Sequence, residues 1–600
     1  MSAVRTDVPP AWEHGCGCGG PLAAALAIGA AIDGPDHHGS AHGQGHAHRR
    51  DRRQASGQVT VLTGATVLPV DDSFSEAEAV AVSDGRIVAV GSEAAVRAAA
   101  GPDARRVDRP GATILPGFIE PHAHLLPSAL FGPWADVGPF RFPTVDGALG
   151  HLAALAAARP DGGDDWVLAR QFDPSLQEGP DELTTAELDR ISTTRPVVVL
   201  NASLHFAYVN QVALDRAGIT ATTPDLAGSP YGRHPDGRPN GVLLGQPAMI
   251  SVLAHRPGMG DVDLVAAALA VVRRANSVGI TTICDQGTGG VLGGGDLDVY
   301  AALAASGALT TRLRHSLFDL RSDDWDARGV APGDGDALVR ATGWKIVSDG
   351  SNQGRSGRQR DPYLPRPGWP EDHRGVAYVE PDDLAAKVAR RAAEGWQVVV
   401  HANGDAAIDA ALDAFAAVDG GPAAAAHRRH RIEHCSILHD EQVERLAALG
   451  VSPSFLIGHV GWWGRAFRDD LLGPERADLL DRAGACDRAG IRWTMHSDEL
   501  VTPMGPLRCI GQAVTRRLSA EPGTVLAPDE RVTVEAAIRA MTADAAWQCH
   551  SDHEVGTLEA GKRADLVVLA EDPRAVDPEA IADIAVLETW FDGEPVFSAV

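Results

Sequence analysis

A short apolar segment followed by an Ala- and Leu-rich amphipathic segment recurs along most of the chain, and this alternation constrains the fold more than any other feature. Apolar runs that alternate with helical patterns indicate βα units built on a parallel sheet. The helical patterns include residues 382–394 and 405–418. Eight candidate strands can be counted, at residues 112–120, 280–287, 311–319, 343–350, 396–404, 430–438, 450–458 and 491–499. The pattern therefore predicts an α/β fold organised as a closed (β/α)8 TIM barrel.

The two ends of the chain have a different texture, with short β-branched runs separated by turn-forming Asp and Gly. These runs lie at residues 59–70, 79–91, 556–573 and 586–598, and a helical stretch at about 532–546 precedes the last two. We expect residues 57–112 and 550–600 to pair into a small β-sandwich domain, with the barrel at 113–549 between them. Length alone would also allow several domains, but α/β barrels often exceed the usual domain size.

The gap between the first and second barrel strands is too long for a single crossover. It covers about residues 125–262 and contains strand-like segments of its own at 165–172 and 195–203. This gap predicts a large insertion after the first barrel strand. Because the insertion leaves from the carboxyl end of a strand, we expect it above the mouth of the barrel, where substrates bind.

The charge of the chain limits the partners that it can bind. A formal net charge of −27 and a pI near 5.2 argue against a surface that neutralises nucleic-acid phosphates or anionic lipid. A small neutral or cationic substrate is easier to accept, although such acidity is also an ordinary way to keep a soluble protein dispersed. We therefore expect a small-molecule substrate and no nucleic-acid or membrane partner, and a homodimer is compatible with the sequence.

The beginning of the chain and the cysteines bear on its compartment. Residues 1–56 are rich in Gly and His without sustained periodicity, which is typical of a flexible tail. The apolar run at residues 21–32 is shorter than the roughly 20 residues that a membrane helix needs. Seven cysteines, an odd number spread thinly, do not resemble a disulfide framework. These features predict a cytoplasmic protein.

Side chains that can bind metal fall at the ends of the predicted strands. His122 and His124 close the first strand, where the two-residue period of an extended segment points both rings to one side. Lys345 ends the fourth strand, and a lysine facing the barrel interior must be neutralised. An ion pair with Asp349 would do this, and so would carbamylation by carbon dioxide, which turns the amine into a bridging carboxylate. The residues alone leave both alternatives open.

Three further candidates follow the later strands. His401 ends the fifth strand, His434 ends the sixth and Asp498 closes the eighth. A single histidine at such a place is more often a hydrogen-bonded core residue, and an aspartate also suits a helix N-cap. The carboxyl ends of parallel barrel strands meet at one rim, however, so the six residues are expected to converge there. Together they predict a divalent-metal site.

The motifs GFIEPHAH, KIVSDGS, VHANGDAAID, RIEHCS, HSDELVTPMGPL and GTLEAGKRADLVVL, in this order, make the chain resemble the amidohydrolase superfamily. The resemblance runs from about residue 59 to 596 and points to the branch that includes N-substituted formamide deformylase. It implies a binuclear centre in which His122, His124 and Asp498 hold one metal, His401 and His434 hold the second, and carbamylated Lys345 bridges them. It also implies that Asp498 takes the proton from the attacking water.

The resemblance extends to residues around this centre. It implies a substrate contact for His205, and His459 and Trp462 lie at the end of the seventh strand, where they are candidates for the same role. A structural role in a loop is the alternative for each. Asp285 ends the second strand and is a candidate to orient a ligand histidine from behind.

These residues predict an enzyme that cleaves an amide or other non-peptide C–N bond of a small organic substrate by metal-bound hydroxide. The expected cofactor is two zinc ions, with iron, manganese or cobalt as alternatives for the same ligands. A ring aminohydrolase or deaminase would use the same metal geometry. A non-catalytic binding protein on the same fold is the alternative outside enzymes.

Overall fold

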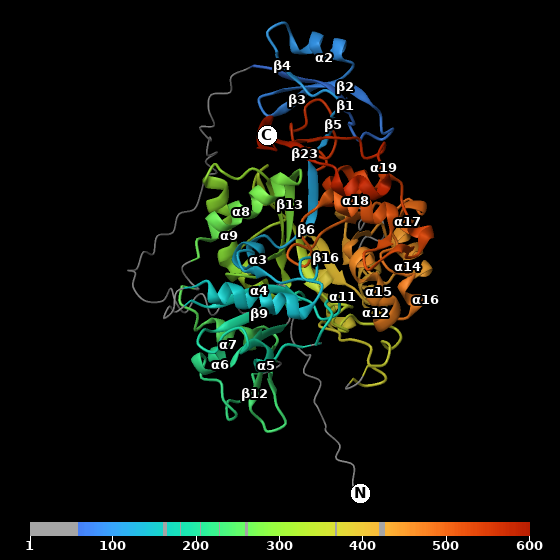
Figure 1. Ribbon diagram of the computed structural model, residues 1–600. Coiled ribbons are helices and arrows are strands. Elements are labelled where there is room, and N and C mark those ends of the chain that lie inside the picture. The colour runs from blue at the N-terminus through green and yellow to red at the C-terminus, as the bar shows by residue number, and fades with distance from the viewer. Residues whose placement is uncertain are drawn as a thin grey trace.

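The structure is a computed structural model that describes residues 58–159, 165–180, 182–204, 206–226, 229–258, 262–366, 369–418 and 427–599. The tail predicted at residues 1–56 lies outside these residues. Figure 1 shows three parts: a sheet formed by both chain ends at the top, a barrel in the middle and a second sheet at the bottom.

Eight parallel strands form the barrel, which confirms the predicted α/β barrel fold. Neighbouring strands follow the order β19-β18-β17-β16-β15-β14-β13-β6, and each neighbouring pair in this order is parallel. The strands are β6 (Phe118–Ala123), β13 (Ile280–Thr288), β14 (Arg312–Phe318), β15 (Val339–Val347), β16 (Gln397–Ala402), β17 (Arg431–His434), β18 (Ser452–Phe455) and β19 (Thr494–Met495). Almost every residue of these strands is buried, and apolar runs such as residues 398–400 in β16 are their local signal in the sequence.

The first predicted barrel strand is divided between two sheets at Gly117. Residues Thr113–Pro116 form β5 of the terminal sheet, and the chain then continues as β6 of the barrel. A Cβ at Gly117 would lie 2.3 Å from Thr281 Oγ1, so only glycine lets the two backbones approach this closely.

The barrel closes between β6 and β19 largely through individual contacts, because β19 has only two residues. Ala123 and Glu499 form an isolated parallel bridge, and His124 N donates to Glu499 O at 2.8 Å. The buried Glu120 carboxylate accepts from Ser497 N at 3.0 Å and Ser497 Oγ at 2.8 Å. The closure therefore fixes the two chain segments that carry the candidate ligands His124 and Asp498.

Amphipathic helices cover the outside of the barrel (Figure 1). In α11 (Pro381–Ala393), Leu384, Val388 and Ala392 recur at helical spacing and are buried. This helix and α12 (Asp405–Ala416) confirm the two predicted helices, and the stretch predicted at 532–546 forms α19 (Val534–Ala540) and α20 (Ala543–Gln548). The other long helices are α8 (Leu264–Ser277), α9 (Asp296–Ala305), α14 (Asp440–Leu449) and α18 (Pro506–Thr515).

Both chain ends contribute to the terminal sheet, in the order β24-β23-β22-β5-β1-β2-β3 with β4 paired to β1. Val80, Val568 and Trp590 belong to its buried apolar core. The strands are β1 (Thr60–Val67), β2 (Ala77–Ser83), β3 (Arg86–Gly91), β4 (Arg105–Asp108), β5, β22 (Leu566–Leu569), β23 (Val586–Phe591) and β24 (Glu594–Ser598), and α2 (Glu93–Ala100) follows β3.

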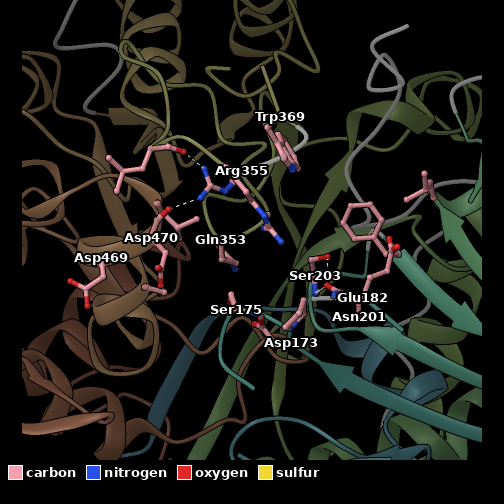
Figure 2. A pocket seen from close by; sticks show the side chains of 18 of the residues that line it. Asp173, Ser175, Glu182, Asn201, Ser203, Gln353, Arg355, Trp369, Asp469 and Asp470 are labelled. Carbon is pink, nitrogen blue, oxygen red and sulfur yellow. Dashed lines mark hydrogen bonds between the residues drawn. The ribbon is translucent and has the colours of Figure 1, made fainter. Parts of the chain in front are cut away.

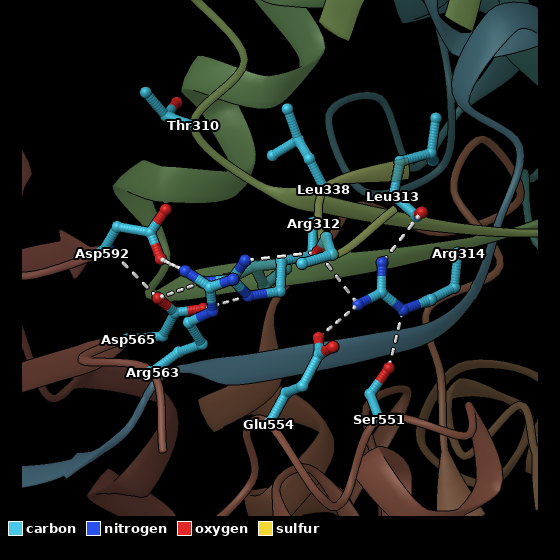
Figure 3. A network of polar contacts seen from close by, with 12 residues as sticks. Thr310, Arg312, Leu313, Arg314, Leu338, Ser551, Glu554, Arg563, Asp565 and Asp592 are labelled. Atoms are coloured by element: carbon cyan, nitrogen blue, oxygen red, sulfur yellow. Dashed lines mark hydrogen bonds and ion pairs between the residues drawn. The ribbon is translucent and has the colours of Figure 1, made fainter. Parts of the chain in front are cut away.

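A buried ion-pair network joins this sheet to the amino end of the barrel (Figure 3). Arg312, the first residue of β14, donates to both oxygens of Asp565 at 2.9 and 3.0 Å and to Asp592 at 2.5 Å. Beside it, Arg314 donates to Ser551 Oγ at 2.7 Å and to Glu554 at 3.1 Å. The network lies at the barrel end opposite to the one that holds the candidate ligands.

The insertion after β6 forms a second sheet with its own core, in the order β11-β12-β10-β9-β8-β7. The two predicted strands are present as β8 (Val167–Phe172) and β9 (Val197–Asn201). The other strands are β7 (Ala135–Asp136), β10 (Phe206–Val209), β11 (Tyr231–Arg233) and β12 (Pro239–Leu244), accompanied by α3 (Leu125–Phe131), α4 (Val145–Ala157), α5 (Thr185–Leu188), α6 (Gln211–Arg216) and α7 (Gln246–Leu253).

Two global features bear on the chain's environment. Among the helices in the described residues, none is long and apolar enough to cross a membrane. Five cysteines lie in the described parts of the chain, and all five are buried and free of disulfides.

Candidate metal centre

The structure brings the predicted ligands together at the carboxyl end of the barrel. Their side chains come from the ends of β6, β15, β16 and β17 and from the loop after β19, and all are buried. The residues are His122, His124, Lys345, His401, His434 and Asp498.

Three of these residues form a compact donor set. Asp498 Oδ1 lies 3.2 Å from His124 Nε2 and 3.5 Å from His122 Nε2. The donor atoms of the three side chains all lie within 4.8 Å of one another. Two imidazoles and a carboxylate at this spacing match the ligand types of a divalent cation.

A second donor set shares His122 and includes a residue that the sequence analysis missed. The donor atoms of His122, His434 and His496 also lie within 4.8 Å of one another. His496 Nε2 is 3.4 Å from His434 Nδ1, and Ser454 Oγ is 2.9 Å from His496 Nδ1. The signal was local: His496 precedes Asp498 by two residues and so has the strand parity that points both side chains to the same side.

His401 borders the second set. Its ring centroid lies 4.5 Å from that of His434. Its Nε2 is 3.3 Å from Gly350 O and 3.1 Å from Asn403 Nδ2. The barrel mouth therefore holds five histidines in mutual contact, arranged as one continuous cluster around His122 and His434.

Two of the candidate ligands have left-handed backbone conformations. His434 has φ of 65° and Asp498 has φ of 53°. Non-glycine residues adopt this region at a cost of roughly 1–2 kcal/mol each, and such strain gathers at functional sites. The backbone turns that aim these side chains into the barrel mouth are therefore held by the surrounding fold.

Lys345 is fully buried in the middle of these groups, and its Nζ makes no hydrogen bond within the described part of the chain. Asp349, which the sequence offered as an ion-pair partner, instead accepts backbone N–H groups of Arg358, Asn403 and Gly404 at 2.8 to 2.9 Å.

The electrostatics of the site suit metal ligands. Burial, reinforced for His122 by the charge of Lys345, lowers the pKa of His122, His434 and His496 well below the usual value. Burial disfavours ionisation of Asp498, but the hydrogen bond and charge of His124 lower the pKa of Asp498 to about 2. Metal ligation requires a neutral imidazole and an ionised carboxylate, and the shifts of His122, His434, His496 and Asp498 favour these forms. The donor set therefore fits a divalent metal.

Of the predicted substrate-contact residues, the structure describes two, His459 and Trp462. His459 is buried, with its Nδ1 3.3 Å from Ser436 Oγ and 3.8 Å from Asp481 Oδ1. Trp462 packs against Phe140 of the insertion, with the ring centroids 3.9 Å apart and the ring planes tilted by 34°. His205 lies outside the described residues.

Asp285 acts on the backbone next to a ligand. Its Oδ2 accepts from Leu125 N at 3.0 Å, one residue after His124, and from the Tyr300 hydroxyl at 2.7 Å. The carboxylate that contacts a ligand imidazole belongs to Glu433, which the sequence analysis did not select: Glu433 Oε2 is 2.5 Å from His122 Nδ1.

A cavity of about 920 Å³ lies where the insertion meets two loops of the barrel (Figure 2). Asp173 and Asn201 line it from the insertion, and Gln353, Arg355 and Trp369 line it from the loop after β15. Contacts connect this cavity to His459. Asp173 accepts from Trp463 Nε1 at 3.0 Å, and the Trp463 ring lies 5.8 Å from that of His459.

Comparison with known proteins agrees with this geometry. The sequence model of the amidohydrolase family matches residues 106–597. The chain belongs to the amidohydrolase family. It is 30% identical over 556 residues to N-substituted formamide deformylase of Arthrobacter pascens, covering 89% of this chain and 97% of that protein.

Two solved structures share the fold. An uncharacterized metal-dependent hydrolase from Pyrococcus horikoshii aligns with a TM-score of 0.66 and 20% identity, covering 87% of this chain and 99% of its own. A second one, from Pyrococcus furiosus, aligns with a TM-score of 0.64 and 22% identity, covering 86% and 100%. The match of the family model over most of the chain confirms the amidohydrolase family that the sequence motifs predicted.

Proposed function

We propose that this amidohydrolase cleaves an amide or other non-peptide C–N bond of a small organic molecule with the help of bound divalent metal. The observation that carries the proposal is the pair of buried donor sets that share His122 at the barrel mouth. The similarity to a formamide deformylase over most of both chains supports a C–N bond as the target.

We assign the first metal to His122, His124 and Asp498, and the second to His401 and His434. Lys345 would bridge them after its amine forms a bond to the carbon of CO2 and releases a proton, which yields a carboxylate. The buried Nζ without a hydrogen-bond partner in the described residues supports this assignment. Two zinc ions are our proposal for the cofactor, and iron, manganese and cobalt share the same ligand preference.

A bound divalent cation would supply an activated water and polarise the substrate carbonyl. The protein must then move the protons. Asp498 Oδ1 faces His122 and His124, so we assign proton transfer to Oδ2, which accepts the proton of the attacking water and returns it to the departing amine nitrogen. An amine leaves far more readily once protonated, so one carboxylate serves both halves of the reaction.

The substrate would enter at the side of the insertion. The cavity of about 920 Å³ has both acidic and basic residues in its wall together with Trp369, Phe206 and Tyr208, which suits a polar organic molecule with a flat group. We assign substrate contacts to His205, His459 and Trp462. A small-molecule substrate, a homodimer and a cytoplasmic location are part of this proposal.

The test is a substrate panel with metal-loaded enzyme: formamides, aryl amides, cyclic imides, and cyclic amidines to detect ring deamination. We expect hydrolysis of at least one amide or imide class, and a loss of about 10²- to 10⁴-fold in kcat for Asp498→Asn. Asp298→Asn, which changes an exposed carboxylate on α9, is the matched control with unchanged kcat. Wild-type rates in Asp498→Asn, or no hydrolysis by fully metal-loaded enzyme, would contradict the proposal and favour a binding protein.

A further inference from the structure

A buried carboxylate contacts His122 from the side opposite to the donor cluster. His122 Nδ1 and Glu433 Oε2 are 2.5 Å apart, and both side chains are at most 1% exposed. The other ring nitrogen, Nε2, faces Asp498. The two nitrogens of this imidazole therefore have separate partners. Nδ1 contacts Glu433 behind the ring, and Nε2 faces the candidate ligand Asp498.

A guanidinium fixes the carboxylate in turn. Arg431 lies two residues before Glu433 on the same face of β17 and is fully buried. Its Nε donates to Glu433 Oε1 at 2.8 Å, and one terminal nitrogen donates to Oε2 at 3.0 Å, a bidentate geometry. The same terminal nitrogen donates to Pro121 O at 3.1 Å, which is the residue next to His122. Arg431 thus positions both the backbone beside His122 and the carboxylate that contacts its ring.

This arrangement determines how His122 can act. A neutral imidazole carries one N–H, and a proton on Nδ1 that donates to Glu433 leaves the lone pair on Nε2. That lone pair points to the side of Asp498, where the ligand atoms gather. Ligand histidines commonly donate their other N–H to a carboxylate, which fixes the ring and makes it a better donor.

We propose that Glu433, held by Arg431, is a positioning residue that fixes His122 with Nε2 toward the metal and thereby sets the affinity of the centre. The inference rests on the metal centre of the proposed function, but it makes no assumption about the substrate. Because His122 is one of the three ligands assigned to the first metal and also belongs to the second donor set, loss of its support would weaken zinc binding.

A purely structural ion pair is the competing explanation, and variants can separate the two. Glu433→Gln removes the charge and leaves Arg431 buried without its partner, which itself destabilises the fold. The double variant Arg431→Met/Glu433→Leu removes both charges, and apolar replacement of a buried pair is often neutral for stability. Only the double variant therefore removes the support of His122 without leaving an unpaired buried charge.

The measurement is the dissociation constant for Zn²⁺ alone, by competition with a chromogenic chelator on the full-length apo protein, alongside its thermal unfolding temperature. We expect both Glu433→Gln and the double variant to bind zinc about 10- to 100-fold more weakly. Asp565→Asn is the control, because it breaks another buried Arg–carboxylate pair at the far end of the barrel. It should lower the unfolding temperature and leave zinc affinity unchanged.

Wild-type zinc affinity in the double variant would overturn the proposal, because the pair would then only hold the barrel together. A loss of zinc affinity in Asp565→Asn as large as that in Glu433→Gln would overturn it as well. Zinc affinity is measured without substrate, so failure of the proposed amide hydrolysis would not affect the test of Glu433. Failure of the Glu433 proposal would likewise not affect the proposed hydrolysis.

Discussion

The burial of the ion pair between Arg312 and Asp565 predicts how much a substitution of Asp565 destabilises the fold. Asp565→Asn keeps the shape of the side chain but removes the charge from a bidentate pair whose side chains are 1% and 2% exposed. Removing one partner of a buried pair costs about 3–5 kcal/mol. Arg312 keeps its contact with Asp592, so we expect the lower end, about 3 kcal/mol.

The expected shift in unfolding temperature follows from the size of the protein. With an unfolding entropy of about 2.1 cal/mol/K per residue, a cooperative unit of about 500 residues loses about 3 °C for 3 kcal/mol. Scanning calorimetry of the apo protein at pH 7 measures this shift. Asp298→Asn is the matched control, because it breaks a bidentate pair with Arg328 whose side chains are 70% and 40% exposed. Exposed pairs contribute about 0–1 kcal/mol, so the control should lose less than about 1 °C. Equal shifts in both variants would refute the argument from burial.

Three further predictions follow from other parts of the molecule. His430 is buried, its Nδ1 accepts from Val398 N at 2.9 Å, and burial lowers its pKa to about 3. Below about pH 6.5 His430 is protonated in the unfolded chain but stays neutral in the folded protein. As the pH falls from 6 to 4, His430 should therefore lower the free energy of unfolding by about 1.4 kcal/mol per pH unit. His430→Asn should reduce the slope of the free energy of unfolding against pH by about this amount in this range, and an unchanged slope would disprove the assignment. Zinc at 100 times its dissociation constant should stabilise the apo protein by about 2.7 kcal/mol, and a chelator should reverse the gain in a thermal shift assay; no shift in either direction would argue against a metal centre. Trp463→Phe removes the 3.0 Å hydrogen bond to Asp173, which links the barrel to the insertion at the wall of the cavity. We therefore expect KM to rise while the zinc content stays unchanged. An unchanged KM would show that the cavity does not bind the substrate.

The barrel could be predicted from the sequence because its strands are buried on both faces. β16 (Gln397–Ala402), for example, is buried throughout, contains three consecutive valines and is followed by an amphipathic helix, so both elements leave a local signal. His122, His401 and His434 could be predicted from the sequence for the same reason, since each of them ends a strand of this kind. Their convergence follows from barrel topology alone.

Other features were missed because their signals are not local. Glu433 and His122 are 311 residues apart, and no spacing in the sequence relates them. The division of the first strand at Gly117 depends on the close approach of Thr281. His496 could have been found, because it precedes Asp498 by two residues in the predicted eighth strand. The cavity at Asp173 could not, because it depends on how the insertion packs against barrel loops whose conformations the sequence pattern does not predict.

Metal content tests the central claim most directly. The full-length protein, expressed with added zinc and freed of loosely bound ions, should contain stoichiometric divalent metal by elemental analysis. His122→Ala should lose that metal while the far-ultraviolet circular dichroism spectrum is retained, because this residue belongs to both donor sets. Wild-type protein without stoichiometric metal, or a His122→Ala variant that keeps it, would contradict the account.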